Sequence, residues 1–199
     1  MTGIDPLTND PLVWTRDEKD KLEPVKRFPA EKEYLFWVVD GLMRERLVII
    51  QKSRQMFASS LICLYMLWEC LFVDARRWLL SKVTEDDAKE ILRDKIRYPY
   101  SQLPGWFREM YPASDTPEAR IDFGHTASYI EAVAENVANR EARGGTGSVF
   151  VDEAAYQREY SKIWQAALPM AAQIVVVSTP EVGNPGARFL RRQCYDEFD

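Results

Sequence analysis

The sequence predicts an α/β fold in which a mainly parallel central sheet is covered by helices on both faces. Short apolar runs typical of strands alternate along the chain with longer segments of helical periodicity. The runs at 47–50, 149–151 and 174–177 are continuously apolar and do not alternate with polar residues. A strand that is covered on both faces needs this pattern, whereas a strand with one solvent-exposed face would alternate apolar and polar residues.

Each element of this fold has a local signal. The N-terminal arm, residues 1–29, is rich in proline and charge, so the folded domain is predicted to span 30–199. Thr84, followed by Asp87, is a candidate N-cap for a charged helix. The remaining expectations, in chain order, are a helix in 30–46, a strand at 47–50, a helix at 58–72, a strand at 78–80, an irregular proline-rich segment at 98–117, a hairpin of 120–123 with 128–133, a strand at 149–151, a helix at 159–171 and a strand at 174–177.

Composition excludes several function classes. The chain has 199 residues, 46% of them hydrophobic and 29% charged, which suits one sizeable soluble domain. A net charge of −5 argues against nucleic-acid binding through overall basicity, although a local basic patch stays open. The most apolar stretch, 61–73, is too short for a membrane span of about 20 residues. No signal peptide is recognised at the N-terminus, and no membrane association is expected.

Cysteine and histidine give no sign of a metal centre. Cys63, Cys70 and Cys194 are widely spaced, which favours neither a disulfide framework nor a zinc site and fits a reducing, intracellular setting. His125 is the single histidine, and no catalytic signature flanks it. We expect His125 to be structural.

The first candidate site is the segment 52–60, which follows a predicted strand and leads into a predicted helix. Ligands in open parallel sheets bind at the carboxyl ends of strands. The segment fails the standard phosphate loop G-x-x-x-x-G-K-[ST], because Phe57 replaces the second glycine and Ala58 the lysine before Ser59. Lys52, at the start of the loop, is predicted to supply the missing positive charge, and Arg54 a bidentate phosphate contact. The alternative is an ordinary basic turn.

The second strand end is the run 149–151 followed by Asp152 and Glu153, the pattern called Walker B. Asp152 is predicted to hold Mg²⁺, and Glu153 to polarise the water that attacks the γ-phosphate. A solvated acidic pair at a helix N-terminus is the alternative.

The third strand end carries Ser178 and Thr179, which follow the apolar run at 174–177. These two residues are predicted to sense the γ-phosphate. The alternative is a simple strand exit, in which one of the hydroxyls caps a turn.

These three motifs, in this order, resemble the N-terminal ATPase domain of phage terminase large subunits. The segment Ser53-Arg54-Gln55 resembles that family's phosphate loop, and the leading lysine resembles its lysine-displaced Walker A variant. The resemblance covers about residues 30–180 and implies a P-loop NTPase of the additional-strand type. The residues it implies are, for nucleotide binding, Lys52, Ser53, Arg54, Gln55, Met56, Phe57, Ala58, Ser59 and Ser60; for metal, Ser59 and Asp152; for catalysis, Glu153 and Arg143; and for coupling, Ser178 and Thr179.

Through the same resemblance, Arg143 is expected to act on the γ-phosphate held by a neighbouring subunit and is favoured over Arg140. The implied cofactors are ATP and Mg²⁺. The implied partners are double-stranded DNA, a portal protein, a small terminase subunit and further copies of the chain in a ring on the procapsid, in the host cytoplasm. The nuclease domain that usually follows is expected to be absent from 30–199.

The chain departs from the family at two places. Phe57 stands where a glycine is usual, and the helix before the first strand offers only Glu31 or Glu33 where a glutamine often reads adenine. Two other functions therefore stay open. One is a helicase-like ATPase of superfamily 2, and the other is a degenerate nucleotide-binding module that serves only in assembly.

Overall fold

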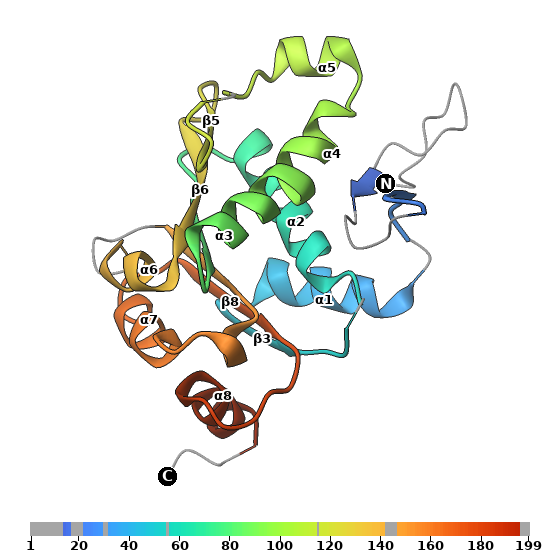
Figure 1. Cartoon of the computed structure of the whole chain (residues 1–199). Helices are drawn as coiled ribbons and strands as arrows, with labels where there is room; N and C mark the ends of the chain where they lie inside the picture. The colour runs from blue at the N-terminus through green and yellow to red at the C-terminus, as the bar shows by residue number, and fades with distance from the viewer. Residues whose placement is uncertain are drawn as a thin grey trace.

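A six-stranded sheet lies at the centre of the molecule. Helices flank this sheet (Figure 1). The computed structural model describes residues 14–16, 22–29, 32–54, 56–114, 116–141 and 147–195. The strand order is β3-β8-β7-β4-β6-β5, and every neighbouring pair is parallel except the antiparallel pair of β5 with β6. The predicted α/β class is therefore confirmed. The strands are β3 Leu47–Gln51, β4 Arg77–Lys82, β5 Arg120–Phe123, β6 Ser128–Ala134, β7 Ser148–Asp152 and β8 Gln173–Ser178.

Helices cover both faces of this sheet, as expected. Adjacent residues of β4 show the division, because Trp78 packs into one hydrophobic cluster and Leu79 into the other. Every residue of β7 and β8 is buried, which accounts for their continuous apolar runs. On the first face lie α1 Glu33–Arg44, α2 Ala58–Phe72, α3 Glu85–Leu92, the π-helical turn η1 Arg93–Arg97 and α4 Tyr98–Ser101. On the second lie α6 Glu135–Glu141, the 3-10 turn η3 Ala154–Tyr156, α7 Tyr160–Ala167 and α8 Pro185–Tyr195.

Two helices begin where the sequence predicts. The helix predicted at 58–72 has those bounds as α2. Thr84 caps α3 as predicted, since its hydroxyl accepts a hydrogen bond from the Asp87 backbone N–H at 3.1 Å. The helix predicted at 159–171 is shorter, because α7 ends at Ala167 and a turn follows.

The segment 98–117 has more regular structure than predicted. It contains α4 and the short helix α5 Gly105–Met110, with the π-helical turn η1 just before it. The predicted hairpin forms as β5 and β6. His125, in its turn, contacts the Leu71 carbonyl oxygen through Nε2 at 2.9 Å and packs against Tyr111, which fits the expected structural role. Cys63 is fully buried, and burial raises the pKa of its thiol to about 12.

The described part of the N-terminal arm forms a small ribbon. Its strands β1 Trp14–Arg16 and β2 Val25–Arg27 pair antiparallel with each other and not with the central sheet. Residues 30 and 31 lie outside the described ranges, so the boundary between arm and core stays a prediction. No helix in the described part of the chain has the length and apolar character that crossing a membrane requires.

The sheet order places all three motif-bearing strands side by side. β8 lies between β3 and β7. This position makes β8 the inserted strand that defines the additional-strand type. In this register Gln51 pairs with Ser178, and Asp152 pairs with Val177. Because the three strands are parallel, their carboxyl ends meet at one edge of the sheet.

Candidate functional site

Asp152 lies at the centre of this edge and is almost completely buried. Its side chain is 3% exposed at the end of β7. One carboxylate oxygen, Oδ1, accepts a hydrogen bond from the Ser59 hydroxyl at 2.6 Å, and the other, Oδ2, lies 3.0 Å from the Lys82 ammonium. Burial raises the pKa of Asp152, but Lys82, Lys95 and the Ser59 hydrogen bond outweigh it and hold the pKa below its ordinary value. Asp152 is therefore a carboxylate at neutral pH.

Glu153 follows in a left-handed backbone conformation, with φ of 55°. Its Oε1 lies 3.2 Å from the Lys52 ammonium, and its Oε2 accepts hydrogen bonds from the Thr179 N–H at 3.1 Å and the Thr179 hydroxyl at 2.9 Å. Burial raises the pKa of Glu153, but the bonds from Thr179 and the charge of Lys52 lower it more, so the net shift is downward. The first, second and third motifs thus meet on one carboxylate.

The loop between β3 and α2 is fixed at both ends. The Lys52 N–H donates to the Ser178 carbonyl at 3.0 Å, and the Tyr34 hydroxyl donates to the Met56 carbonyl at 2.9 Å. Phe57 adopts φ of 54° directly before α2. This is the left-handed conformation that glycine takes without penalty, so Phe57 holds a backbone conformation that favours glycine. The Phe57 ring packs edge-on against Phe28 at 6.5 Å between centroids.

The predicted loop residues divide into an inner and an outer group. Ser59 and Ala58 are buried at the start of α2, whereas Ser53 and Arg54 are exposed. Arg54 makes no hydrogen bond or ion pair with the other residues that the structure describes. Ser60 is half-buried on the first turn of α2.

Ser178 connects the third motif to the second through a hydrogen-bonded turn. Its buried hydroxyl accepts from the Ala155 N–H at 3.0 Å and donates to the Thr179 carbonyl at 2.9 Å. The end of β8 is therefore tied both to Glu153 and to the turn that follows it.

Three residues that the sequence analysis named, Gln55, Arg143 and Glu31, lie outside the described residues. The side chain of Arg140, at the end of α6, is likewise not described.

The sequence analysis did not predict two polar residues at this edge. Lys82 ends β4, and Gln157 donates from Nε2 to the carbonyls of Asp152 at 2.9 Å and Ser81 at 3.1 Å. Lys82 stands just after the apolar run at 78–80, so the rule that strand ends carry chemistry would have found it. The Oε1 of Gln157 accepts a hydrogen bond from the Ser81 hydroxyl at 3.0 Å. Nothing in the sequence points to Gln157, because the fold alone brings these partners to it.

The oxygen donors at this edge suit Mg²⁺ bound together with a nucleotide. The described residues contain no cluster of three or more histidine, cysteine or acidic side chains that could hold a metal on its own. Ser59 and Asp152 supply two adjacent oxygens, and Mg²⁺ in nucleotide sites commonly takes one or two protein oxygens with phosphates and water completing the shell. The residues present therefore fit a metal brought in with phosphate.

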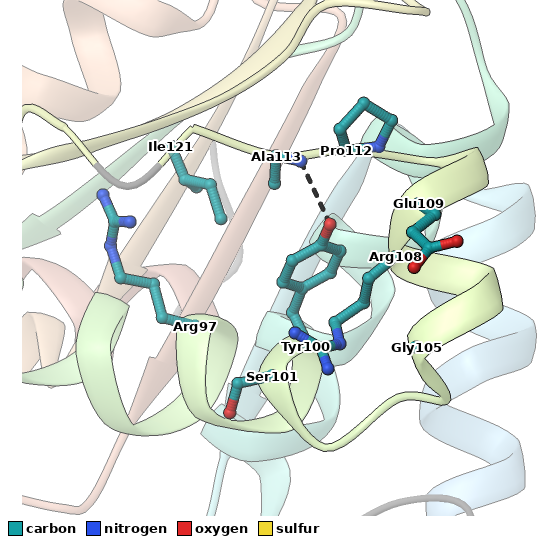
Figure 2. A pocket seen from close by; sticks show the side chains of 9 residues that line it. All are labelled: Arg97, Tyr100, Ser101, Gly105, Arg108, Glu109, Pro112, Ala113 and Ile121. Atoms are coloured by element: carbon teal, nitrogen blue, oxygen red, sulfur yellow. Dashed lines mark hydrogen bonds between the residues drawn. The ribbon is translucent and has the colours of Figure 1, made fainter.

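A separate cavity of about 460 Å³ lies between α4, α5 and the start of β5 (Figure 2). Tyr100 lines it, and its hydroxyl accepts a hydrogen bond from the Ala113 N–H at 3.0 Å (Figure 2). The same hydroxyl donates to the Tyr111 carbonyl at 2.8 Å. None of the three motifs contributes a residue to its lining. These hydrogen bonds stabilise the segment 98–117, so their role is structural.

Neither a protein-family model nor a curated protein matches the sequence. Solved structures do match it. The large terminase ATPase domain of Thermus phage P74-26 superposes with a TM-score of 0.55 and 16% identity, covering 79% of this chain and 73% of that one. The fold is that of a phage large terminase ATPase domain.

Two longer terminases share this fold. The HK97 bacteriophage large terminase matches with a TM-score of 0.55 and 14% identity over 79% of this chain and 34% of its own. The large terminase of a thermophilic bacteriophage matches with a TM-score of 0.54 and 12% identity over 74% of this chain and 39% of its own. A crystal form of the same thermophilic phage protein in complex with ADP also matches, with a TM-score of 0.50. The chain thus spans well under half the length of these two terminases.

Proposed function

We propose that this chain is the ATPase motor domain of a viral DNA-packaging terminase, which hydrolyses ATP to drive double-stranded DNA into a procapsid. The observation that carries the proposal is the meeting of three strand ends on Glu153, which Lys52 and Thr179 contact from β3 and β8. The terminase ATPase fold supports it, as does the ADP complex of the thermophilic phage terminase.

In this proposal the polar groups divide the work of phosphoryl transfer. Ser59 and Asp152 would hold Mg²⁺, which would supply positive charge to offset the negative charge of the phosphates. Lys52, freed from Glu153, places its positive charge on the phosphates. Glu153 accepts a hydrogen bond from the attacking water and orients it; its lowered pKa keeps it ionised for that task.

The Ser178–Thr179 segment is suited to report the state of the site. Thr179 bonds directly to Glu153, and Ser178 bonds to the turn η3, against which α8 packs. A shift of Glu153 toward water must therefore break or move the bonds from Thr179. We propose that this change passes through β8 to the surface that grips DNA.

The rest of the assembly follows from the same proposal. The partners are double-stranded DNA, the portal protein, the small terminase subunit and neighbouring copies in a ring on the procapsid in the host cytoplasm. Arg143 of one copy completes the site of the next; an arginine supplied in trans accelerates GTP hydrolysis by about 10³ to 10⁵.

One observation favours a second candidate, the degenerate nucleotide-binding module. Phe57 and Ala58 replace the loop's usual glycine and lysine, and the Lys52 ammonium is held by a carboxylate. Such a module would bind nucleotide without turnover. Hydrolysis therefore separates the two candidates.

The deciding experiment measures phosphate release and ATP binding in parallel, for the ring-forming protein with double-stranded DNA. We expect Glu153→Gln to bind ATP like the wild type and to lose hydrolysis by about 100-fold or more, since it removes the group that activates water. Glu159→Gln, which removes a carboxylate paired with Lys162, is the matched control and should hydrolyse normally. Binding without turnover in the wild type would instead establish the degenerate module.

A second assay addresses packaging itself. Purified procapsids carrying the portal should protect DNA from nuclease only when the wild-type protein and ATP are both present. Hydrolysis that proceeds without any DNA protection would leave an ATPase that is not a packaging motor.

A further inference from the structure

Lys82 belongs to none of the three motifs, yet it contacts the proposed metal ligand. Its side chain leaves the end of β4, the strand next to β7 on the side away from β3. The side chain is 19% exposed, and its ammonium lies 3.0 Å from Oδ2 of Asp152, while the Ser59 hydroxyl takes Oδ1. Both oxygens of this carboxylate are thus engaged by the protein itself.

A buried carboxylate needs this kind of partner. Asp152 is 3% exposed, and an unpaired charge at such depth is strongly disfavoured. Lys52 does not fill the need, because its ammonium lies on Glu153. The two carboxylates therefore contact different lysines, one from the phosphate loop and one from β4, and the charge of Lys95 also acts on Asp152.

We propose that Lys82 is a counter-ion that competes with the divalent metal for Asp152, so that the metal binds there tightly only together with nucleotide. This inference rests on the proposed function, which makes Asp152 a metal ligand. Lys82 is in this account a positioning residue, since it acts through Asp152.

The competition follows from charge. A divalent cation on Oδ1, beside the Ser59 hydroxyl, would lie close to the Lys82 ammonium on Oδ2 of the same carboxylate, so repulsion between the two cations opposes metal binding while Lys82 stays in place. Without nucleotide, the metal gains only Ser59 and Asp152 as protein ligands, and the Lys82 ammonium would lose its contact with Asp152. With nucleotide, the phosphates add metal ligands and offer an acceptor to the ammonium. Metal and nucleotide binding are thereby coupled.

The test measures the affinity of Mn²⁺ alone by calorimetry, without nucleotide. We expect Lys82→Met to bind Mn²⁺ at least about tenfold more tightly than the wild type, because it removes the competing charge. Lys82→Arg keeps the charge and should bind as weakly as the wild type. Lys89→Met, which removes a lysine on α3 that pairs with Glu85, controls for net charge and should also match the wild type. Adding Asp152→Asn to Lys82→Met should abolish the tight site.

Thermal unfolding followed by circular dichroism checks that each variant folds, and Lys82→Gln replaces Lys82→Met if the latter does not. Equal Mn²⁺ affinity in the wild type and in the folded neutral variant would overturn the inference. A second measurement adds ADP, which should strengthen Mn²⁺ binding more in the wild type than in the Lys82 variant. If ADP has no effect on either protein while the neutral variant still gains Mn²⁺ affinity, the competition between Lys82 and the metal stands, but the coupling to nucleotide and the proposed function both fail.

Discussion

Phe57 holds a backbone conformation that costs a residue with a side chain about 1–2 kcal/mol relative to glycine. Its ring recovers part of this cost through the edge-on contact with Phe28 and the Lys32 ammonium 6.0 Å from the ring centroid. The replaced glycine is therefore tolerated through packing that only the folded chain provides.

This account predicts an order of stability at position 57. Phe57→Gly and Phe57→Ala both lose the ring, but only glycine is free of the left-handed penalty. The glycine variant should be more stable than the alanine variant by about 1 kcal/mol in urea unfolding. Ala75, which has φ of 56° in a turn, is the control, and Ala75→Gly should show a gain of the same sign. An alanine variant as stable as the glycine variant would contradict the assignment.

At the residue scale, the sequence identified candidate residues of the site, but it did not predict which of their side chains contact one another. Asp152, Glu153 and Thr179 could be selected because they follow continuous apolar runs, and parallel strands bring such ends together. That Lys52 contacts Glu153 could not be predicted, because the side-chain path depends on the loop geometry. Lys82 could have been selected by the same rule.

At the scale of elements, α8 lies against the turn that follows Glu153. Gly186 makes this approach possible, since a Cβ there would lie 2.1 Å from the Gln157 carbonyl oxygen and 2.7 Å from that of Ala154. Such contacts are too short for any real Cβ. The glycine therefore sets how closely α8 packs on the acidic strand end.

Replacing this glycine should displace α8. Gly186→Ala is expected to lower the free energy of unfolding by about 1–3 kcal/mol, because the backbone must move to relieve the overlap. Gly41→Ala is the matched control: a Cβ at Gly41 in α1 meets nothing within 4 Å, so that variant should gain about 0.5–1 kcal/mol. Urea unfolding of both variants measures this, and equal effects at the two positions would refute the close packing.

Element types followed from periodicity, whereas some boundaries did not. The helix at 58–72 was predicted with its observed bounds, because apolar residues fill it and a polar loop precedes it. The short helices α4 and α5 were missed, since the prolines of 98–117 favour an irregular path and tertiary contacts such as that of Tyr100 with the Tyr111 carbonyl hold the turns.

At the scale of the whole molecule, the buried acidic pair makes stability depend on pH. The folded-state pKa values of Asp152 and Glu153 lie below their ordinary ones. Groups of this kind stabilise the fold above their unfolded pKa values, near about pH 4, and lose that contribution as the pH falls toward the folded values. Protonation of Asp152 and Glu153 should therefore contribute to a lower free energy of unfolding in acid.

The measurement is the free energy of unfolding of the wild type and Asp152→Asn between about pH 7 and about pH 3. The variant should be less stable at neutral pH, and the difference should narrow as the pH falls. Asp86→Asn, at an exposed position on α3, should follow the wild type throughout. A difference that stays constant or widens in acid would show that Asp152 does not stabilise the fold as a carboxylate.

In the proposed function, Lys52 carries the phosphate-binding charge of a loop that lacks the usual lysine. Calorimetry with a non-hydrolysable ATP analogue and Mg²⁺ tests it directly. We predict that Lys52→Ala weakens binding by about 10- to 100-fold, as expected for losing a charged hydrogen bond of about 1.5–3 kcal/mol. Lys162→Ala, an exposed lysine on α7, should bind normally. Unchanged affinity in a folded Lys52→Ala variant would contradict the claim.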